Sequence, residues 1–192
     1  MKNLKMHSRP AALCVGLLVF GAASAADLSS LLGTGAPHGT VALDNAQATV
    51  CFSPDGCGEE LIVEAIDHAQ QQILVQAYGF SNRNILWALG KAKARKVDVE
   101  VIVDKSDEAT KGRDYLAGFH VPVWIDTEPA IAHNKVMIID GTSVITGSFN
   151  FTYSAQAKNA ENVLFLQNVP TLAKLYTDNW NWRKSASRVF SQ

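Results

Sequence analysis

The sequence predicts an α/β fold in which a mixed β-sheet is flanked by helices on both faces. Segments with alternating apolar residues, typical of strands, take turns with segments of helical period through much of the chain. Near its end, the pair Asp140-Gly141 separates two further apolar segments. Such a pair is a strong hairpin signal, so part of the sheet is expected to be antiparallel.

The elements are expected in a regular order along the chain. Segments of period 2 predict strands at 48–52, 72–80, 97–104, 121–125, 136–139, 143–146 and 163–167. Amphipathic segments predict helices at 59–71, 84–96 and 170–187, the last one opened by Pro170. Residues 106–118 are polar and are expected to form a mobile loop or a short helix. The chain shows no internal repeat and no low-complexity segment.

Residues 1–25 have the pattern of a secretory signal peptide. Lys2, Lys5 and Arg9 precede an apolar segment, which ends at the small-residue site Ala23-Ser24-Ala25. A retained membrane helix is the alternative, but the apolar segment is shorter than the about 20 residues that span a bilayer. We expect a secreted or periplasmic protein without stable membrane insertion. Residues 26–47 would then be a flexible lead-in and 48–192 a single domain.

The charge of the chain does not favour a general polyanion binder. The chain has 17 Lys and Arg against 18 Asp and Glu. Removal of residues 1–25 takes away three cations and no acid, which leaves 14 against 18, a net charge of −4. Non-specific nucleic-acid binders normally carry a positive field. A polyanionic substrate would therefore depend on a local patch, and its binding should be weak and sensitive to salt.

Two cysteines remain after removal of the signal, because Cys14 lies within it. Cys51 and Cys57 flank a turn-like stretch of five residues, and an oxidising compartment favours a disulfide over a metal pair. Closing so short a loop would stabilise the fold by about 2 kcal/mol. Two free thiols are the alternative.

Polar residues gather at the open end of the predicted hairpin. Side chains alternate along a strand, so His133 shares a face with Lys135, and Ser148 shares one with Asn150. A two-residue turn at Asp140-Gly141 or Gly141-Thr142 would bring the two pairs to one face. A three-residue turn would place them on opposite faces.

This set of side chains suits cleavage of a phosphodiester. An imidazole can attack phosphorus and form a covalent phosphohistidine, which divides one displacement into two. An ammonium and an amide can stabilise the charge on the non-bridging oxygens. Gly147 would let the backbone approach a phosphate. No residues have the spacing of a metal cage, so no cofactor is expected.

The combined motif resembles the HKD signature of the phospholipase D superfamily. It runs from His133-Asn134-Lys135 through Asp140 to Gly147-Ser148. The continuation through Asn150 and the later stretch 158–162 resemble the small bacterial Nuc-type endonucleases. The resemblance extends from about Ala48 to the last helix and implies the α/β/α sandwich of that superfamily.

The resemblance also implies roles for these residues. His133 would be the nucleophile, Lys135 and Asn150 would hold the phosphate, and Ser148 would contribute at the site. Glu161 would accept a hydrogen bond from His133. Asp140 matches the acidic residue of the motif, but it also begins a turn, and a structural role is the stronger interpretation.

The leaving oxygen needs a proton, and the chain has one copy of the motif. The resemblance implies a homodimer in which the partner's copy of His133 is the acid, with both imidazoles titrating as a coupled pair. A monomer that uses His120 instead is the alternative. Taken singly, each motif residue has an ordinary explanation, such as a surface charge or a turn former. His68 and His120 are expected to be structural.

Three classes of function compete on this evidence. A non-specific endonuclease acting on DNA or RNA is the first. A phospholipase D acting on phosphatidylcholine-type lipids is the second, with 106–118, Phe149 and Phe151 as a lipid entry. A binding protein without activity is the third, and the complete motif argues against it. Aromatic residues and cations of the last helix could stack bases and neutralise phosphates, although a core role is expected for such a helix; these are Trp180, Trp182, Arg183, Lys184 and Arg188.

Overall fold

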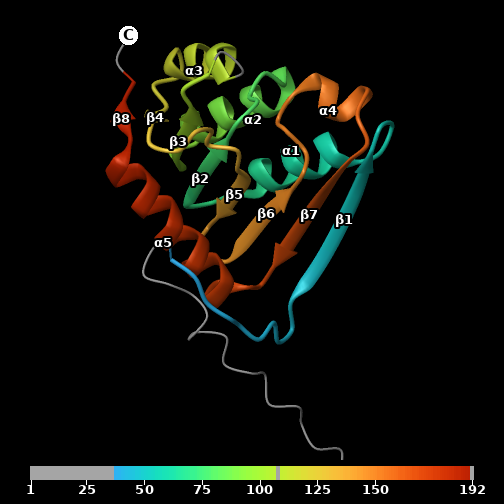
Figure 1. The fold of residues 1–192 in the computed structure, drawn as a ribbon. Coiled ribbons are helices and arrows are strands. Elements are labelled where there is room, and N and C mark those ends of the chain that lie inside the picture. The colour runs from blue at the N-terminus through green and yellow to red at the C-terminus, as the bar shows by residue number, and fades with distance from the viewer. Residues whose placement is uncertain (1–36, 107–108, 191–192) are drawn as a thin grey trace, which may run out of the picture.

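The structure is a computed structural model and describes residues 37–106 and 109–190. Its centre is an eight-stranded sheet with the strand order β1-β7-β6-β5-β2-β3-β4-β8 (Figure 1). The strands are β1 (Gln47–Ser53), β2 (Gln72–Ala77), β3 (Asp98–Asp104), β4 (Val123–Asp126), β5 (Lys135–Ile139), β6 (Ser143–Gly147), β7 (Glu161–Gln167) and β8 (Arg188–Val189). β2, β3 and β4 are parallel and the other pairs are antiparallel, so the predicted mixed sheet is confirmed.

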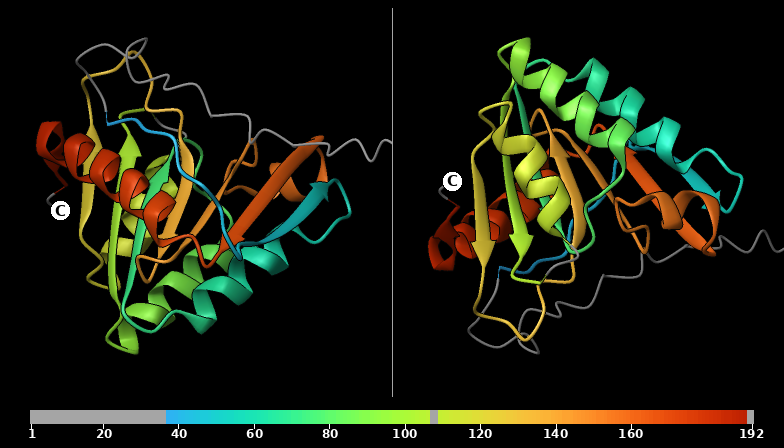
Figure 2. Two further views of the ribbon diagram at one scale, coloured as in Figure 1. Left: turned by 90° about the horizontal axis from the view of Figure 1, so that it is seen from below. Right: turned by 90° about the horizontal axis from the view of Figure 1, so that it is seen from above.

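Helices cover both faces of the sheet, as the sequence predicts. The helices are α1 (Gly58–His68), α2 (Arg83–Ala94), α3 (Thr110–Ala117), α4 (Tyr153–Ala157) and α5 (Pro170–Ala186). The first view in Figure 2 shows α5 on one face of the sheet and α1 and α2 on the other. Within the described residues, no helix is both long enough and apolar enough to cross a membrane.

The central strand β2 is buried on both sides and divides the core in two. Ile73, Val75 and Ala77 point into the larger cluster under α1 and α2, whereas Leu74 joins the smaller cluster under α5. Continuous apolar segments of this kind are typical of parallel strands covered on both faces. In the smaller cluster, the buried Trp180 ring donates a hydrogen bond from Nε1 to the Val75 carbonyl (3.0 Å).

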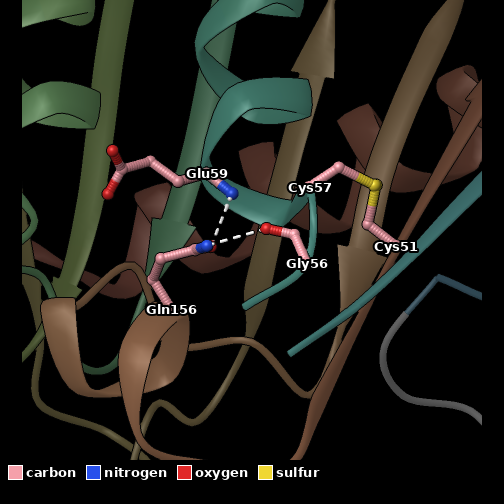
Figure 3. The surroundings of a disulfide bond; sticks show 5 residues. All are labelled: Cys51, Gly56, Cys57, Glu59 and Gln156. Atoms are coloured by element: carbon pink, nitrogen blue, oxygen red, sulfur yellow. Dashed lines mark hydrogen bonds between the residues drawn. A yellow bond between two sulfur atoms is a disulfide. The ribbon is translucent and has the colours of Figure 1, made fainter. Parts of the chain in front are cut away.

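A disulfide joins the two cysteines predicted to pair. Cys51, on β1, is bonded to Cys57, which directly precedes α1, and the two Cα atoms are 5.4 Å apart. Gln156 of α4 fastens the same loop, because its side chain donates to the Gly56 carbonyl (2.8 Å) and accepts from the Glu59 amide (2.9 Å) (Figure 3). The loop between β1 and α1 is therefore tied at both the strand and the helix.

Some elements differ from the prediction. The short helix α4 was not predicted, and neither was the two-residue strand β8. In the stretch 106–118, the short helix that was one of the two expected alternatives is present as α3. The proposed signal peptide at 1–25, with Cys14, and residues 26–36 of the expected lead-in lie outside the described residues. Those assignments remain expectations.

Candidate active site

All the predicted functional residues except Asp140 lie at one edge of the sheet. β2, β3 and β4 end at this edge, because they are parallel. β5 and β7 begin there and β6 ends there, because β5 is antiparallel to β2 and the three strands alternate in direction. The carboxyl ends of parallel strands are a frequent location for ligand sites in α/β proteins.

His133 and Lys135 meet around the ring of Tyr78, which follows β2. Ala77 pairs with Lys135 across the two strands. The exposed His133 ring lies 4.6 Å from the Tyr78 ring, centroid to centroid. Lys135 is only 6% exposed; its Nζ donates to the His133 carbonyl (2.6 Å) and lies 5.3 Å from the Tyr78 centroid. One aromatic ring thus contacts both the imidazole and the ammonium.

The environment of Lys135 changes its acidity. Burial lowers the pKa of Lys135 from its ordinary value, because the charged ammonium is less well solvated, and the negative charge of Glu161 opposes this shift. Lys135 begins β5 and Glu161 begins β7, and both strands begin at the same edge of the sheet.

Ser148, Asn150 and Glu161 complete the edge. Ser148 Oγ donates to Glu161 Oε2 (2.5 Å) and accepts from the Asn162 amide (3.1 Å). The other Glu161 oxygen accepts from the Asn159 side chain (3.0 Å). Asn150 Oδ1 accepts from the Gly79 amide (3.4 Å), next to Tyr78. Both carboxylate oxygens of Glu161 are thus held by neighbours, with no bond to His133 among the described contacts.

The two-residue hairpin turn is wrong. Ile139 pairs with Ser143, so the connection has three residues, 140–142. The Thr142 amide donates to the Ile139 carbonyl (3.1 Å), and Asp140 and Gly141 both have positive φ (52° and 63°). Simple alternation along this hairpin would separate the His133 pair from the Ser148 pair.

Gly147 explains why these residues still share an edge. β6 ends at Gly147, whose φ of 152° turns the chain, so strand alternation does not continue to Ser148. A Cβ at Gly147 would lie 2.2 Å from the Asn162 carbonyl, and that carbonyl accepts from the amides of Ser148 and Phe149 (3.2 and 3.3 Å). The absence of a side chain at Gly147 thus permits close contact with β7.

Asp140 lies at the opposite end of β5 from Lys135. Its carboxylate accepts from three consecutive backbone amides, those of Gln70 (2.9 Å), Gln71 (2.8 Å) and Gln72 (3.0 Å). These bonds fix the segment that enters β2. The contacts are those of a structural residue, and Asp140 is separated from the cluster around His133.

Asp104 is a site residue that sequence reasoning missed. It ends β3, is buried, and accepts hydrogen bonds from the Ser106 amide (2.8 Å) and from the Ala132 amide next to His133. Burial alone would raise the pKa of Asp104, but the bonds from Ala132 and Ser106 outweigh it and hold that pKa below its ordinary value. The position of these two residues, Asp104 at the end of β3 and Tyr78 directly after β2, was the available signal.

The other histidines considered from the sequence lie away from this edge. His68 ends α1 and its Nδ1 contacts the Glu64 carbonyl (2.8 Å). His120 has a φ of 56° and precedes β4, whose other end reaches the site. Both histidines therefore lie at the opposite end of the sheet from His133. The alternative in which His120 is the acid for His133 in a monomer is wrong.

A hollow of about 230 Å³ adjoins His133 on the side of α5. Asn134, Gln76 and Trp182 are among its walls. A larger hollow of about 570 Å³ lies beside Asp140, at the far end of the sheet, and is not part of this site. In the described part of the chain, no group of three or more His, Cys, Asp and Glu residues is placed to hold a metal ion.

Comparisons with known proteins agree with this geometry. A family model described as "Cardiolipin synthase, PLD-like domain" matches residues 62–183. Phospholipase D from Rickettsia prowazekii is 44% identical over 149 residues, which cover 77% of this chain and 72% of that relative. Among solved structures, Nuc from Salmonella typhimurium, a phospholipase D family member, has a TM-score of 0.74 and 35% identity over 77% of this chain and 100% of Nuc. NucT from Helicobacter pylori shares the fold at 19% identity, with a TM-score of 0.67 over 76% of this chain and 100% of NucT.

Proposed function

This chain belongs to the phospholipase D superfamily and is a phosphodiester hydrolase, and we propose that it is a non-specific endonuclease that cleaves DNA and RNA without a metal ion. The observation that carries the proposal is the exposed His133 imidazole beside the buried Lys135 ammonium at the sheet edge. The nuclease assignment rests on the Nuc-type motif residues and on the alignment with the whole length of Nuc.

The reaction proceeds in two displacements. In the first, a ring nitrogen of His133 attacks phosphorus; the P–N bond forms, the bond to the leaving oxygen breaks, and that oxygen takes a proton from an acid. In the second, water attacks phosphorus, gives its proton to the same group, and releases His133. Lys135 and Asn150 stabilise the phosphoryl oxygens in both steps.

Ser148 and Glu161 position this machinery. Glu161 is the group that orients His133 once substrate is bound, and Ser148 holds the Glu161 carboxylate through its short hydrogen bond. The charge of Glu161 also favours the protonated form of Lys135, which counters the effect of burial. These two residues thus support the nucleophile and the phosphate-binding cation.

The acid is His133 of a second copy in a homodimer. Mixing wild type with His133→Ala tests this requirement after the subunits have exchanged. When the two proteins are mixed in equal amounts, random pairing leaves about a quarter of the dimers with two intact histidines. The activity should then be about a quarter of that of wild type alone at the same total protein concentration. A fall to about half would mean that each subunit works alone and would refute the shared site.

The substrate is tested by incubating the protein with plasmid DNA, RNA and phosphatidylcholine, each with EDTA. We expect cleavage of both nucleic acids, unaffected by the chelator. His133→Ala should abolish it without changing thermal unfolding, and His68→Ala, at the other end of the sheet, is the matched control. Turnover by His133→Ala would refute the nucleophile, and inhibition by EDTA would refute the metal-free mechanism.

A phospholipase D is the second candidate, favoured by the name of the Rickettsia prowazekii relative. The net charge of −4 after residue 25 also suits a neutral lipid better than a polyanion. Release of the head group without cleavage of nucleic acid would establish this alternative. In either case residues 1–25 direct the protein out of the cytoplasm, and it meets its substrate in the periplasm or outside the cell. Retention of those residues in the exported protein would refute their role as a cleaved signal peptide.

A further inference from the structure

The hollow beside His133 has the composition of a site for a flat, polar group. We name it the amide hollow; its walls include Gln76, Asn134, Asn179, Trp182 and Ile131, with His133 at its margin. Its volume of about 230 Å³ is below the roughly 300–1,000 Å³ of sites that enclose a drug-sized ligand. One ring system fits such a space better than a complete nucleotide.

The three amides form a chain with a defined direction. Asn134 Nδ2 donates to Gln76 Oε1 (2.7 Å), and Gln76 Nε2 donates to Asn179 Oδ1 (3.4 Å). Within the described contacts, this direction leaves Asn134 Oδ1 as a free acceptor and Asn179 Nδ2 as a free donor. The chain therefore presents a free acceptor at its Asn134 end and a free donor at its Asn179 end. The edge of a nucleobase carries donors and acceptors that can bond to such groups.

The charges around the amide hollow are already neutralised. Arg183 donates two hydrogen bonds to Asp126 (2.6 and 2.7 Å), and the Asp126 carboxylate is only 2% exposed. Lys184 is paired with Glu100 and lies 4.0 Å from the centroid of the Trp124 ring. These cations of α5 are therefore occupied, which makes the hollow unsuited to a phosphate or a quaternary ammonium group.

The alternation of side chains at the start of β5 separates the position for the phosphate from the position for the base. Neighbouring side chains on a strand point to opposite faces. Lys135 lies on the face of Ala77 and Met137, under α1 and α2, whereas Asn134 bonds to Gln76 on the α5 face. A phosphate at Lys135 and a base beside Asn134 would then lie on either side of His133.

We propose that the amide hollow is a nucleobase subsite, in which the base next to the cleaved phosphate stacks on Trp182 and bonds to Asn134 and Asn179. Trp182 is 42% exposed, unlike Trp180 in the core, and the Arg183 guanidinium lies over its ring, 4.9 Å from the centroid, so a base would stack on the opposite face. A base can enter only when it is unpaired. The subsite therefore gives preference to single-stranded substrate, and it rests on the proposed endonuclease function.

The test compares two strands of equal length, one of thymidine nucleotides and one whose sugars carry no base. Stacking on an aromatic ring contributes about 1–3 kcal/mol per base, so Trp182→Ala should lower kcat/KM for the thymidine strand by about 5- to 150-fold. The loss should lie in KM. Cleavage of the base-free strand should not change, and Trp182→Phe should keep most of the wild-type value.

Trp87→Ala is the matched control, because Trp87 is a 52% exposed tryptophan on α2. Equal losses on both strands with Trp182→Ala, or no loss on either, would overturn the subsite while the nuclease function stands. Failure of the wild type to cleave either strand would overturn the nuclease function and the subsite with it. A loss confined to head-group release from phosphatidylcholine vesicles would assign the hollow to a lipid head group and refute the proposal.

Discussion

Asp104 connects the end of β3 to the residue before the proposed nucleophile, and its substitution by Asn tests that connection. The two carboxylate oxygens accept from two different backbone amides, those of Ala132 and Ser106. An asparagine offers one oxygen and one NH2 group, so it can accept from only one of them. The other buried amide loses its partner, which costs about 1–3 kcal/mol.

Both stability and catalysis should respond to Asp104→Asn. A domain of this size loses about 2–4 °C in Tm for each kcal/mol. If the change moves His133 by about 1 Å, kcat should fall by up to about 100-fold, with little change in KM. Thermal unfolding and steady-state cleavage of DNA measure the two effects. Asp67→Asn is the control, because Asp67 is 37% exposed and pairs with Lys91 on the neighbouring helix.

The pH dependence gives Asp104→Asn a second readout. Because the folded pKa of Asp104 lies below its unfolded value, its stabilising contribution is complete above an unfolded pKa of about 3.9 and is lost as the pH falls through the folded pKa. The difference in unfolding free energy between wild type and variant should therefore shrink below about pH 4. A variant with wild-type kcat, or a difference independent of pH, would refute the connection.

Three further predictions concern the same edge and the loop beside it. Because burial lowers the pKa of Lys135, kcat/KM should decline on the alkaline side at a pH below 10.5, and a decline only above that value would contradict a buried ammonium in the active site. Replacing both Cys51 and Cys57 by Ser should lower the free energy of unfolding by about 2 kcal/mol and the Tm by about 4–8 °C. Calorimetry measures this loss, and His133→Ala is the control that should keep the wild-type Tm. Tyr78→Phe should keep kcat, whereas Tyr78→Ala should lower it about 5- to 10-fold, because a ring contact contributes about 1 kcal/mol; equal losses would implicate the hydroxyl instead.

The order and type of the large elements could be predicted because burial leaves a direct mark on sequence. β2 has a continuous apolar centre and β3 alternates apolar with polar residues, so both patterns indicate strands clearly. The helix α4 leaves no such mark, since its five residues include one buried side chain, Ala155. Its position depends instead on the Thr152 cap and on Gln156, which binds residues about 100 positions away. β8 has two exposed residues and pairs with β4.

The residues of the HKD-like motif could be selected from the sequence, but their geometry could not. Motif spacing was enough to select His133, Lys135 and Asn150. The sequence left the length of the hairpin turn open, and the structure has the three-residue turn, the alternative that separates the two pairs. Gly147 compensates by turning the chain against β7, which is a contact between segments that the sequence alone does not align.

Tyr78 and Asp104 could not be predicted because their roles depend on strand order. Tyr78 follows β2 and Asp104 is the last residue of β3, and both strands lie far from His133 along the chain. They reach it only because β5 inserts beside β2, with β3 on the other side. An antiparallel insertion places the start of β5 next to the ends of two parallel strands, so residues at three termini become neighbours.

The three consecutive residues 133–135, at the start of β5, have three different proposed roles: nucleophile, base recognition and phosphate binding. Strand alternation directs Lys135 to the face of α1 and α2, where it is buried, and Asn134 to the face of α5, where it joins an amide chain. His133 precedes β5 and is exposed, so its ring is not confined to either face. Exchanging the middle residue should therefore alter the choice of substrate and leave the cleavage step intact. Asn134→Ala should raise KM for the thymidine strand without lowering kcat on the base-free strand; a fall in kcat on both strands would show that the two faces do not act independently.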